Sequence, residues 1–281
     1  MAFNPGMAAA SFPPPQAGER ILVLSPHPDD ESLCCGGYIA AAERAGAQVY
    51  IVWATTGDGY WRAVAEANGS LAPDQAAYRR LGLRRMREAR KAAMTLGVPS
   101  EHLYFLGFPD GGLGELYDQF YLRPYRSPHS GLAAAAYPGV FEPGAPYTGA
   151  ELVSLLTRLV KQIRPDRIFL PAIEDRHGDH KALALFGAAA AMRSGYGARM
   201  CRWIVHSGWS WPSPMGYDGD GWLSDPPTGM AYVWQSYELN DWQKELKLEA
   251  VLAYHSQLAV MKDFLLAFVR RNELFSCVSP H

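Results

Sequence analysis

The sequence predicts an α/β fold, a three-layer sandwich in which helices cover both faces of a mainly parallel sheet. Apolar runs at Ile21–Ser25, Val49–Ala54 and Arg167–Leu170 are continuous rather than alternating, as expected of strands buried on both faces. Helical patterns separate these runs, and alternation of strands with helices favours a parallel sheet. The 281 residues, of which 48% are hydrophobic, supply enough apolar material for one sizeable core.

The expected elements form a Rossmann-like arrangement, whose common strand order 3-2-1-4-5 makes the first and fourth strands neighbours. Gly46 and Gly97 stand where glycine commonly ends a helix, and Pro165 ends a third helix because proline cannot continue one. The expected strands are Ile21–Ser25, Val49–Ala54, His102–Leu106, Arg167–Leu170 and Arg202–His206, and the expected helices are Ser32–Ala45, Gln75–Leu96, Ala150–Ile163, Lys181–Met192 and Asn240–Tyr254.

The chain is expected to consist of a flexible tail followed by one domain. Pro5 and the run Pro13-Pro14-Pro15 favour extended backbone, so residues 1–19 are predicted to form the tail. Residues 20–281 are assigned to a single α/β domain.

Two long segments, near residues 107–149 and 207–230, interrupt the alternation. Segments of this length in a compact domain are usually functional loops or lids. Aromatic residues argue against disorder, which is poor in them. We therefore expect the tyrosines of the first segment, and Trp209, Trp211 and Trp222 of the second, to contact a substrate.

Charge and composition exclude several classes of partner. The net charge of −2, from 26 basic and 28 acidic side chains, gives no support to nucleic acid as a partner. No run of 18 apolar residues predicts a membrane span, and the first residues do not resemble a secretory signal. The cysteines match neither a zinc ribbon nor a disulfide framework, so buried thiols and a reducing, cytoplasmic location are expected; they are Cys34, Cys35, Cys201 and Cys277. A homo-oligomer is left open.

The most informative segment is Ser25-Pro26-His27-Pro28-Asp29-Asp30-Glu31, which directly follows the first expected strand. In open α/β sheets, ligands bind beyond the carboxyl ends of the strands, where the strand order reverses. One aspartate could simply form a turn. A histidine and two aspartates together, in a turn stiffened by two prolines, indicate a binding site instead.

A second segment, Glu174-Asp175-Arg176-His177-Gly178-Asp179-His180, directly follows the fourth expected strand. In the order 3-2-1-4-5, its loop faces the first segment across one crevice. His177 and His180 are three residues apart, so they can share a face on the first turn of a helix. The two segments together predict a metal site at the carboxyl ends of strands one and four.

Imidazole and carboxylate ligands suit zinc, which in catalytic sites keeps three protein ligands and one open position for water. We assign His27, Asp30 and His180 as the ligands. Iron(II) is the alternative metal, because two histidines and one carboxylate also suit it. Asp29 is then free to act as general base, and a protonated His177 is free to stabilise an oxyanion or protonate the leaving amine.

These residues resemble the LmbE/PIG-L deacetylase family, which includes N-acetylglucosaminyl deacetylases. The resemblance rests on His27-Pro28-Asp29-Asp30-Glu31 and His177-Gly178-Asp179-His180, and in coarse order it covers nearly the whole chain. Arg87-Glu88 resembles part of the second helix of the family, and Phe105–Gly111 resembles its third strand and loop. Gly178 departs from the pattern, because the family usually has proline there.

The resemblance implies the same zinc ligands, with Asp29 as base and His177 as electrophilic partner. It also implies that Arg87 and Asp110 lie near the substrate. Arg87 belongs to a strongly basic helix, so a solvent-exposed surface position is the equally weighted alternative. The expected activity is hydrolysis of an acyl group, most simply acetyl, from an amide nitrogen of an amino sugar or glycoside. The alternatives are deacylation of a non-sugar amide, such as an acylated antibiotic, and a catalytically inert carbohydrate-binding protein.

Overall fold

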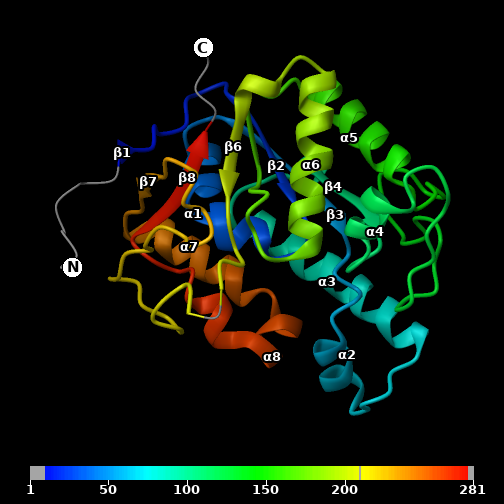
Figure 1. Ribbon diagram of the computed structural model, residues 1–281. Coiled ribbons are helices and arrows are strands. Elements are labelled where there is room, and N and C mark those ends of the chain that lie inside the picture. The colour runs from blue at the N-terminus through cyan, green and yellow to red at the C-terminus, as the bar shows by residue number, and fades with distance from the viewer. Residues whose placement is uncertain (1–9, 209, 278–281) are drawn as a thin grey trace.

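The computed structural model describes residues 10–208 and 210–277, and its strands form one eight-stranded sheet (Figure 1). The strand order is β1-β7-β8-β6-β5-β2-β3-β4. The strands are β1 (Ala10–Ser11), β2 (Arg20–Ser25), β3 (Gln48–Thr55), β4 (Leu103–Phe108), β5 (Arg167–Pro171), β6 (Met200–Trp203), β7 (Gln235–Glu238) and β8 (Asn272–Cys277).

The α-helices include all those expected from the sequence, with ends displaced by a few residues. Three helices were not predicted: α2 and α4 are short and lie near glycines and prolines, and α8 follows α7 almost without a break. The α-helices are α1 (Asp30–Arg44), α2 (Trp61–Asn68), α3 (Gln75–Thr95), α4 (Leu113–Asp118), α5 (Gly149–Ile163), α6 (Gly178–Arg193), α7 (Asp241–Leu252) and α8 (His255–Leu266).

The centre of the sheet is parallel and has the predicted strand order. β2 pairs with β3 on one side, where Ile21 opposes Val49, and with β5 on the other, where Ile21 opposes Arg167. The order β4-β3-β2-β5-β6 is the expected 3-2-1-4-5. Only β8 runs antiparallel, to β6 and to β7, so the sheet is mainly parallel as predicted.

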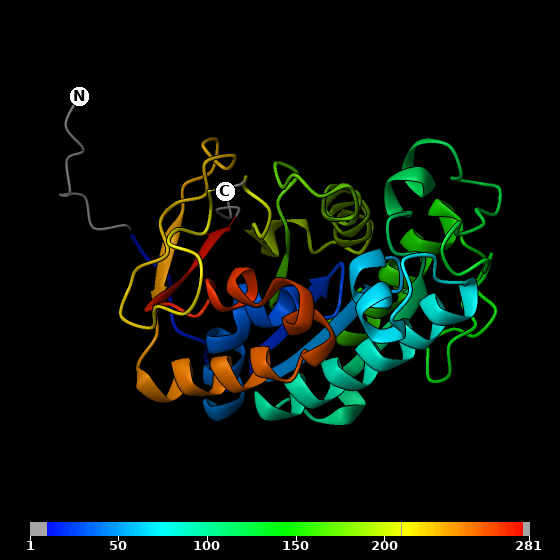
Figure 2. The ribbon, with the colours of Figure 1, turned by 90° about the horizontal axis from the view of Figure 1, so that it is seen from below.

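Helices cover both faces of the sheet, as the sequence predicted. On one face α7 contacts both α1 and α3, and on the other face α4, α5 and α6 contact one another (Figure 2). The connections from β2 to β3 to β4 progress in one direction along the sheet, whereas those to β5 and β6 progress in the opposite direction. Because parallel crossovers are right-handed, this reversal places the helices on opposite faces and opens a crevice between β2 and β5.

The prediction of a flexible tail is wrong for residues 10–19. Ala10 and Ser11 pair with Gln235 and Ser236 of β7, and Phe12 is 2% exposed. The ring of Phe12 packs against several aromatic rings of the core, which stabilises this attachment by roughly 1.5–3 kcal/mol. The prolines that follow carry the chain to β2. Residues 1–9 lie outside the described part of the chain.

The prediction of four buried thiols is half right. Cys34 and Cys35 are free and buried in α1. Cys201 and Cys277, which are 76 residues apart in sequence, form a disulfide between the antiparallel strands β6 and β8. The disulfide removes the cysteine-based argument for a reducing compartment.

Both long segments are folded against the body of the protein. In the first, the Tyr147 hydroxyl donates to the carbonyl of Gly107 at 2.7 Å, and the Tyr137 hydroxyl donates to Asp58 at 2.5 Å. In the second, the Leu223 amide donates to Asn272 of β8 at 2.7 Å. In the described part of the chain, no helix is both long and apolar enough to cross a membrane.

Candidate active site

The His27–Glu31 segment directly follows β2, as the sequence predicted, and its last two residues, Asp30 and Glu31, begin α1. The Ser25 hydroxyl donates to the carbonyl of His27 at 2.7 Å and so fixes the start of the turn. Asp29 has a φ of 134°, a conformation that side-chain-bearing residues rarely adopt. The Asp29 amide donates to the Glu31 carboxylate at 3.2 Å, which helps hold this strained conformation. Strain of this kind concentrates at functional sites.

Three atoms from the two sequence segments converge on the turn. The Nδ1 atom of His27 lies 3.1 Å from Oδ2 of Asp30, and Nε2 of His180 lies 3.2 Å from the same oxygen. Nε2 of His180 is buried and has no hydrogen-bond partner, because its approach to Asp30 lacks hydrogen-bond geometry. Two imidazole nitrogens and a carboxylate oxygen facing one another in this way are a donor set that suits a metal cation.

Asp175 orients the His180 ring. Its Oδ2 atom lies 3.1 Å from Nδ1 of His180 and also accepts the amides of Val205 and His206 at 2.9 and 3.0 Å. Burial alone would raise the pKa of Asp175, but the neighbouring His180 lowers it to about 2. The carboxylate therefore keeps Nδ1 of His180 protonated and leaves Nε2 facing Asp30, an arrangement common behind metal-binding histidines.

Two carboxylates face the other nitrogen of His27. Its Nε2 atom lies 3.1 Å from Oδ2 of Asp179 and 3.2 Å from Oδ1 of Asp110. Burial lowers the pKa of His27, but Asp110 and the other carboxylates raise it above its usual value. These negative charges hold a proton on Nε2 and leave Nδ1 directed at Asp30. Asp110 therefore lies beside His27 and lines the pocket, and its contact with a substrate stays a prediction.

Asp179 also fixes the loop that follows β4. Its carboxylate accepts the amides of Gly111 and Leu113 at 2.7 and 2.9 Å. The sequence placed Asp179 in the second motif but gave it no role. It connects the start of α6 to the first long segment and to His27.

Asp29 is paired with Arg85. Nη2 of Arg85 lies 3.0 Å from Oδ2 of Asp29 and also donates to the carbonyl of Pro28 at 2.7 Å. Burial raises the pKa of Asp29 to about 8 even though Arg85 acts to lower it. Arg87 is exposed and does not line the pocket, so the prediction that it lies near the substrate is wrong. Two residues along an α-helix turn the side chain by about 200°, so Arg85 and Arg87 lie on opposite faces.

His177 caps the N-terminus of α6 and borders the same cluster. Its Nδ1 atom accepts the amide of Asp179 at 3.2 Å, and its ring lies 4.7 Å from that of His27. Burial, followed by the charges of His27 and His180, lowers the pKa of His177 to about 4. The ring is therefore neutral at pH 7, with its proton on Nε2, instead of the protonated ring expected from the sequence. A neutral imidazole can still donate one hydrogen bond.

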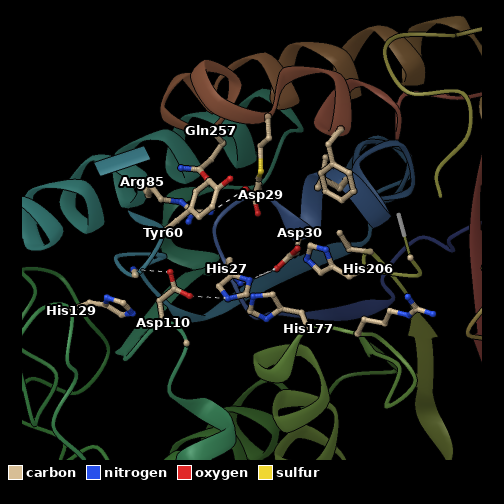
Figure 3. Close-up of a pocket in the computed structure, with 18 of the residues that line it drawn as sticks. His27, Asp29, Asp30, Tyr60, Arg85, Asp110, His129, His177, His206 and Gln257 are labelled. Atoms are coloured by element: carbon tan, nitrogen blue, oxygen red, sulfur yellow. Dashed lines mark hydrogen bonds and ion pairs between the residues drawn. The ribbon is translucent and has the colours of Figure 1, made fainter. Parts of the chain in front are cut away.

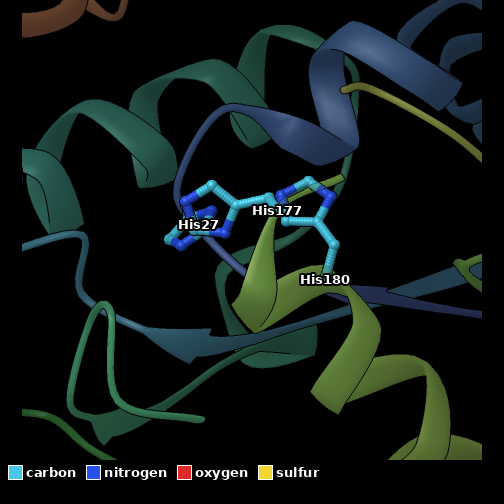
Figure 4. Close-up of side chains that lie close together, drawn as sticks. All are labelled: His27, His177 and His180. Carbon is cyan, nitrogen blue, oxygen red and sulfur yellow. The ribbon is translucent and has the colours of Figure 1, made fainter. Parts of the chain in front are cut away.

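Figure 4 shows that His27, His177 and His180 lie close together although the first is at least 150 positions from the others in sequence. Their ligand atoms lie within 4.8 Å of one another. Two further groups meet the same condition, one formed by Asp30, His180 and His206 and one by His27, Asp110 and Asp179. The described residues thus include a histidine and aspartate cluster that could hold a metal ion.

His206 also belongs to the site, although it was not among the residues predicted from the sequence. It lies three residues beyond β6, at the carboxyl end of the strand next to β5, and its ring lies 4.8 Å from that of His180. A histidine directly after a predicted parallel strand was the available signal. The expected strand Arg202–His206 instead ran through this residue.

Most of the cluster lines a pocket of about 610 Å³ (Figure 3), whereas His180 is fully buried and does not line it. Polar side chains of the lining come from α8, α3 and the first long segment, and apolar side chains line the pocket as well. The lining residues outside the metal-type cluster include Leu33, Tyr60, Arg85, His129, Arg176, Val205, Met215, Gln257, Met261 and Phe264.

The tryptophans of the second long segment do not line this pocket. Trp211 is 3% exposed, packs on Phe268 and donates to the carbonyl of Ser224. Trp222 is exposed but beside Arg271, away from the lining residues. Trp209 lies outside the described residues. The expectation that these tryptophans contact a substrate is therefore wrong for Trp211 and gains no support from Trp222.

The fold and the site together define an α/β protein with a metal-type histidine and aspartate cluster at the switch point of its sheet. A family model described as PIG-L, GlcNAc-PI de-N-acetylase, matches residues 22–191. The chain belongs to this family, as the motifs predicted.

Curated relatives that match the chain have the name 1D-myo-inositol 2-acetamido-2-deoxy-alpha-D-glucopyranoside deacetylase. The protein from Actinosynnema mirum is 34% identical over 148 residues, which cover 52% of this chain and 46% of the relative. One from Saccharopolyspora erythraea is 33% identical over 178 residues, 62% of this chain and 54% of the relative. The chain thus spans about half the length of these relatives.

Solved structures share the fold. N,N'-diacetylchitobiose deacetylase from Pyrococcus horikoshii superposes with a TM-score of 0.56 at 18% identity, covering 92% of this chain and 82% of that one. A zinc-inhibited form of teicoplanin deacetylase gives a TM-score of 0.54 at 20% identity, covering 86% and 85%. At such identities the comparison shows a common architecture.

Proposed function

We propose that the protein is a metal-dependent hydrolase that removes an acetyl group from the amide nitrogen of an N-acetylated amino sugar or its conjugate. The observation that carries this proposal is the convergence of His27, Asp30 and His180, of which His27 and Asp30 line a pocket together with Asp29. The family membership and the names of the curated relatives support it.

The proposed metal is zinc, with iron(II) as the alternative, and the proposed ligands are His27, Asp30 and His180. The buried, unpartnered Nε2 of His180 fits a metal, because a buried nitrogen without a partner is otherwise unfavourable. Two nitrogens and one oxygen suit either ion. When bound, such an ion lowers the pKa of a coordinated water and polarises a carbonyl.

Asp29 is the proposed general base. Its carboxylate is 4% exposed and held by Arg85, so it is fixed in place beside the proposed metal ligands. In its ionised form, Asp29 takes one proton from the water whose oxygen forms the new bond to the amide carbon. The carbon–nitrogen bond breaks, and the nitrogen receives a proton as it leaves, giving a free amine and acetate. General base assistance of this kind contributes about 10²–10⁴ in rate.

His177 is the proposed electrophilic partner. Its Nδ1 atom accepts the Asp179 amide, so the proton resides on Nε2. In this tautomer the ring donates a hydrogen bond to the oxyanion that forms from the amide carbonyl. Preorganised donors at such a position contribute about 10²–10³ in rate.

The polar side of the pocket is the proposed sugar site. Asp110, Tyr60, His129 and Gln257 line it, and together they offer donors and acceptors for hydroxyl groups. The Asp110 carboxylate accepts a hydrogen bond from the Gly59 amide at 2.8 Å, which fixes its position.

A cytoplasmic location stays a prediction from the sequence.

Metal content and acetate release test the proposal together. We expect about one zinc or iron per chain in the purified protein, and loss of that metal in His180→Ala. Acetate release from N-acetylglucosamine conjugates should require the metal. The control is His102→Ala, a part-buried histidine whose Nδ1 contacts the Val49 carbonyl far from the cluster. A parent protein that binds no metal even when zinc is supplied would contradict the proposal.

A further inference from the structure

One helix borders the pocket from its polar side to its apolar side. Gln257, Met261 and Phe264 all belong to α8 and all line the pocket. Gln257 is the polar end of this series, and Phe264 is the apolar end. The helix therefore spans the direction along which a substrate would lie.

The polar end holds an unused hydrogen-bond acceptor. Gln257 is fully buried, its Nε2 donates to the Ser256 hydroxyl at 3.0 Å, and its Oε1 has no hydrogen-bond partner among the described residues. Figure 3 shows Gln257 beside Tyr60 and Arg85, on the same side of the cluster as Asp110 and His129. A buried acceptor without a partner is costly, so this oxygen is placed to receive a hydroxyl or amide donor from a substrate.

The apolar end lies on the opposite side of the cluster. Figure 3 shows His206 on the other side of His27 from Gln257 and Asp110. Phe264 stacks on the His206 ring, with the ring centroids 5.6 Å apart and the planes 6° from parallel. The apolar side chains that line the pocket, here called the apolar wall, are Leu33, Val205, Met215, Met261 and Phe264. Arg176, whose amide donates to the carbonyl of His206 at 2.8 Å, also lines the pocket.

The positions of the polar end, the proposed metal ligands and the apolar end determine which way the amide bond of a bound substrate points. The carbonyl carbon that is attacked has the sugar nitrogen on one side and the acyl chain on the other. Asp29 and the proposed metal ligands lie between the polar end and the apolar end. A sugar bound at the polar end therefore directs its acyl chain along the apolar wall.

We propose that the apolar wall is an acyl subsite, and that the preferred substrates are amino sugars with an N-acyl chain of several carbons, not acetyl alone. This inference rests on the proposed hydrolase function and extends it. Hydrolysis would break the same carbon–nitrogen bond and release a free amino sugar and a medium-chain carboxylate. The pocket of about 610 Å³ is within the range of about 300–1,000 Å³ typical of ligands larger than one small polar group.

A chain-length series tests the proposal. Metal-loaded protein is assayed by amine release from N-acetyl-, N-butyryl-, N-hexanoyl- and N-octanoylglucosamine. A fully buried methylene group increases kcat/KM by about fourfold. Because the wall is partly open to solvent, we expect hexanoyl to exceed acetyl by at least about tenfold.

Variants in the second long segment locate the effect. Met215, 45% exposed, lines the wall, so Met215→Glu should lower the hexanoyl-to-acetyl ratio at least threefold, whereas Met215→Leu should preserve it. Met230 is 88% exposed and does not line the pocket, so Met230→Glu is the matched control and should leave the ratio unchanged.

The outcomes separate this proposal from the proposed function. If acetyl is removed as fast as or faster than hexanoyl, the acyl subsite is refuted and the hydrolase function stands. If the gain appears instead between methyl and hexyl glycosides of N-acetylglucosamine, the wall holds the aglycone and the acyl assignment is overturned. If no N-acyl glucosamine of either series is hydrolysed, the proposed function fails as well.

Discussion

The contact between Asp175 and His180 provides the sharpest prediction about the metal site. Asp175 is fully buried, and its Oδ2 accepts hydrogen bonds from two backbone amides as well as facing Nδ1 of His180. Replacing Asp175 with Asn preserves the shape of the side chain but removes its charge. The side-chain amide of Asn also places its NH₂ group against one of the N–H donors that face the Asp175 carboxylate in the parent protein.

The magnitude follows from two effects. Loss of a carboxylate that orients a metal-binding histidine typically weakens metal affinity by 10- to 100-fold. The pKa of Asp175 is about 2 in the folded protein and about 3.8 in the unfolded chain, because the charge of His180 lowers this pKa by more than burial raises it. A lowered carboxylate pKa stabilises the fold above pH 4 and loses this effect as the pH falls towards 2. At pH 7 the stabilisation is about 2 kcal/mol.

We therefore expect Asp175→Asn to bind zinc 10- to 100-fold more weakly and to lose about 2 kcal/mol of unfolding free energy at pH 7. Competition with a chelator measures the affinity, and urea unfolding of the metal-free protein measures the stability. Asp166→Asn is the control, because Asp166 immediately precedes β5, has a side chain 42% exposed and pairs with surface arginines. Zinc affinity within a factor of three of the parent would refute the orienting role of Asp175.

Three further predictions concern the base, its partner and a buried carboxylate. Asp29→Asn should lower kcat by about 10²–10⁴ while elemental analysis still finds one metal per chain; normal turnover would remove Asp29 as the base. Arg85→Gln should lower kcat/KM by about 10², because Arg85 holds Asp29, whereas Arg87→Gln should stay within twofold; equal effects would contradict the placement of the two arginines. Burial raises the pKa of Asp58 to about 6, so the fold retains its proton while the unfolded chain loses it near pH 4. The unfolding free energy of the parent should therefore decrease between pH 4 and pH 6. This decrease should exceed that of Asp58→Asn by up to about 3 kcal/mol. Parallel curves of unfolding free energy against pH for the two proteins would refute this.

The sequence alone determined the sheet and the two segments of the site. Apolar runs identified the five central strands, because strands covered on both faces cannot carry alternating polar residues. His27, Asp29 and Asp30 follow the first of these strands, and His177 and His180 follow the fourth. In a doubly wound sheet the carboxyl ends of these two strands are adjacent. The sequence pattern therefore predicted that residues far apart in the chain lie close together.

The tertiary structure decided what the local pattern could not. The sequence of a helix with many arginines does not show which arginine faces the crevice. In the structure Arg85 faces it, and Arg87 lies on the opposite face of the helix. The disulfide between Cys201 and Cys277 requires the antiparallel register of β6 and β8, which no spacing in the sequence specifies. Burial in turn determines that His177 is neutral, because solvation and neighbouring charge depend on surroundings assembled from the whole chain.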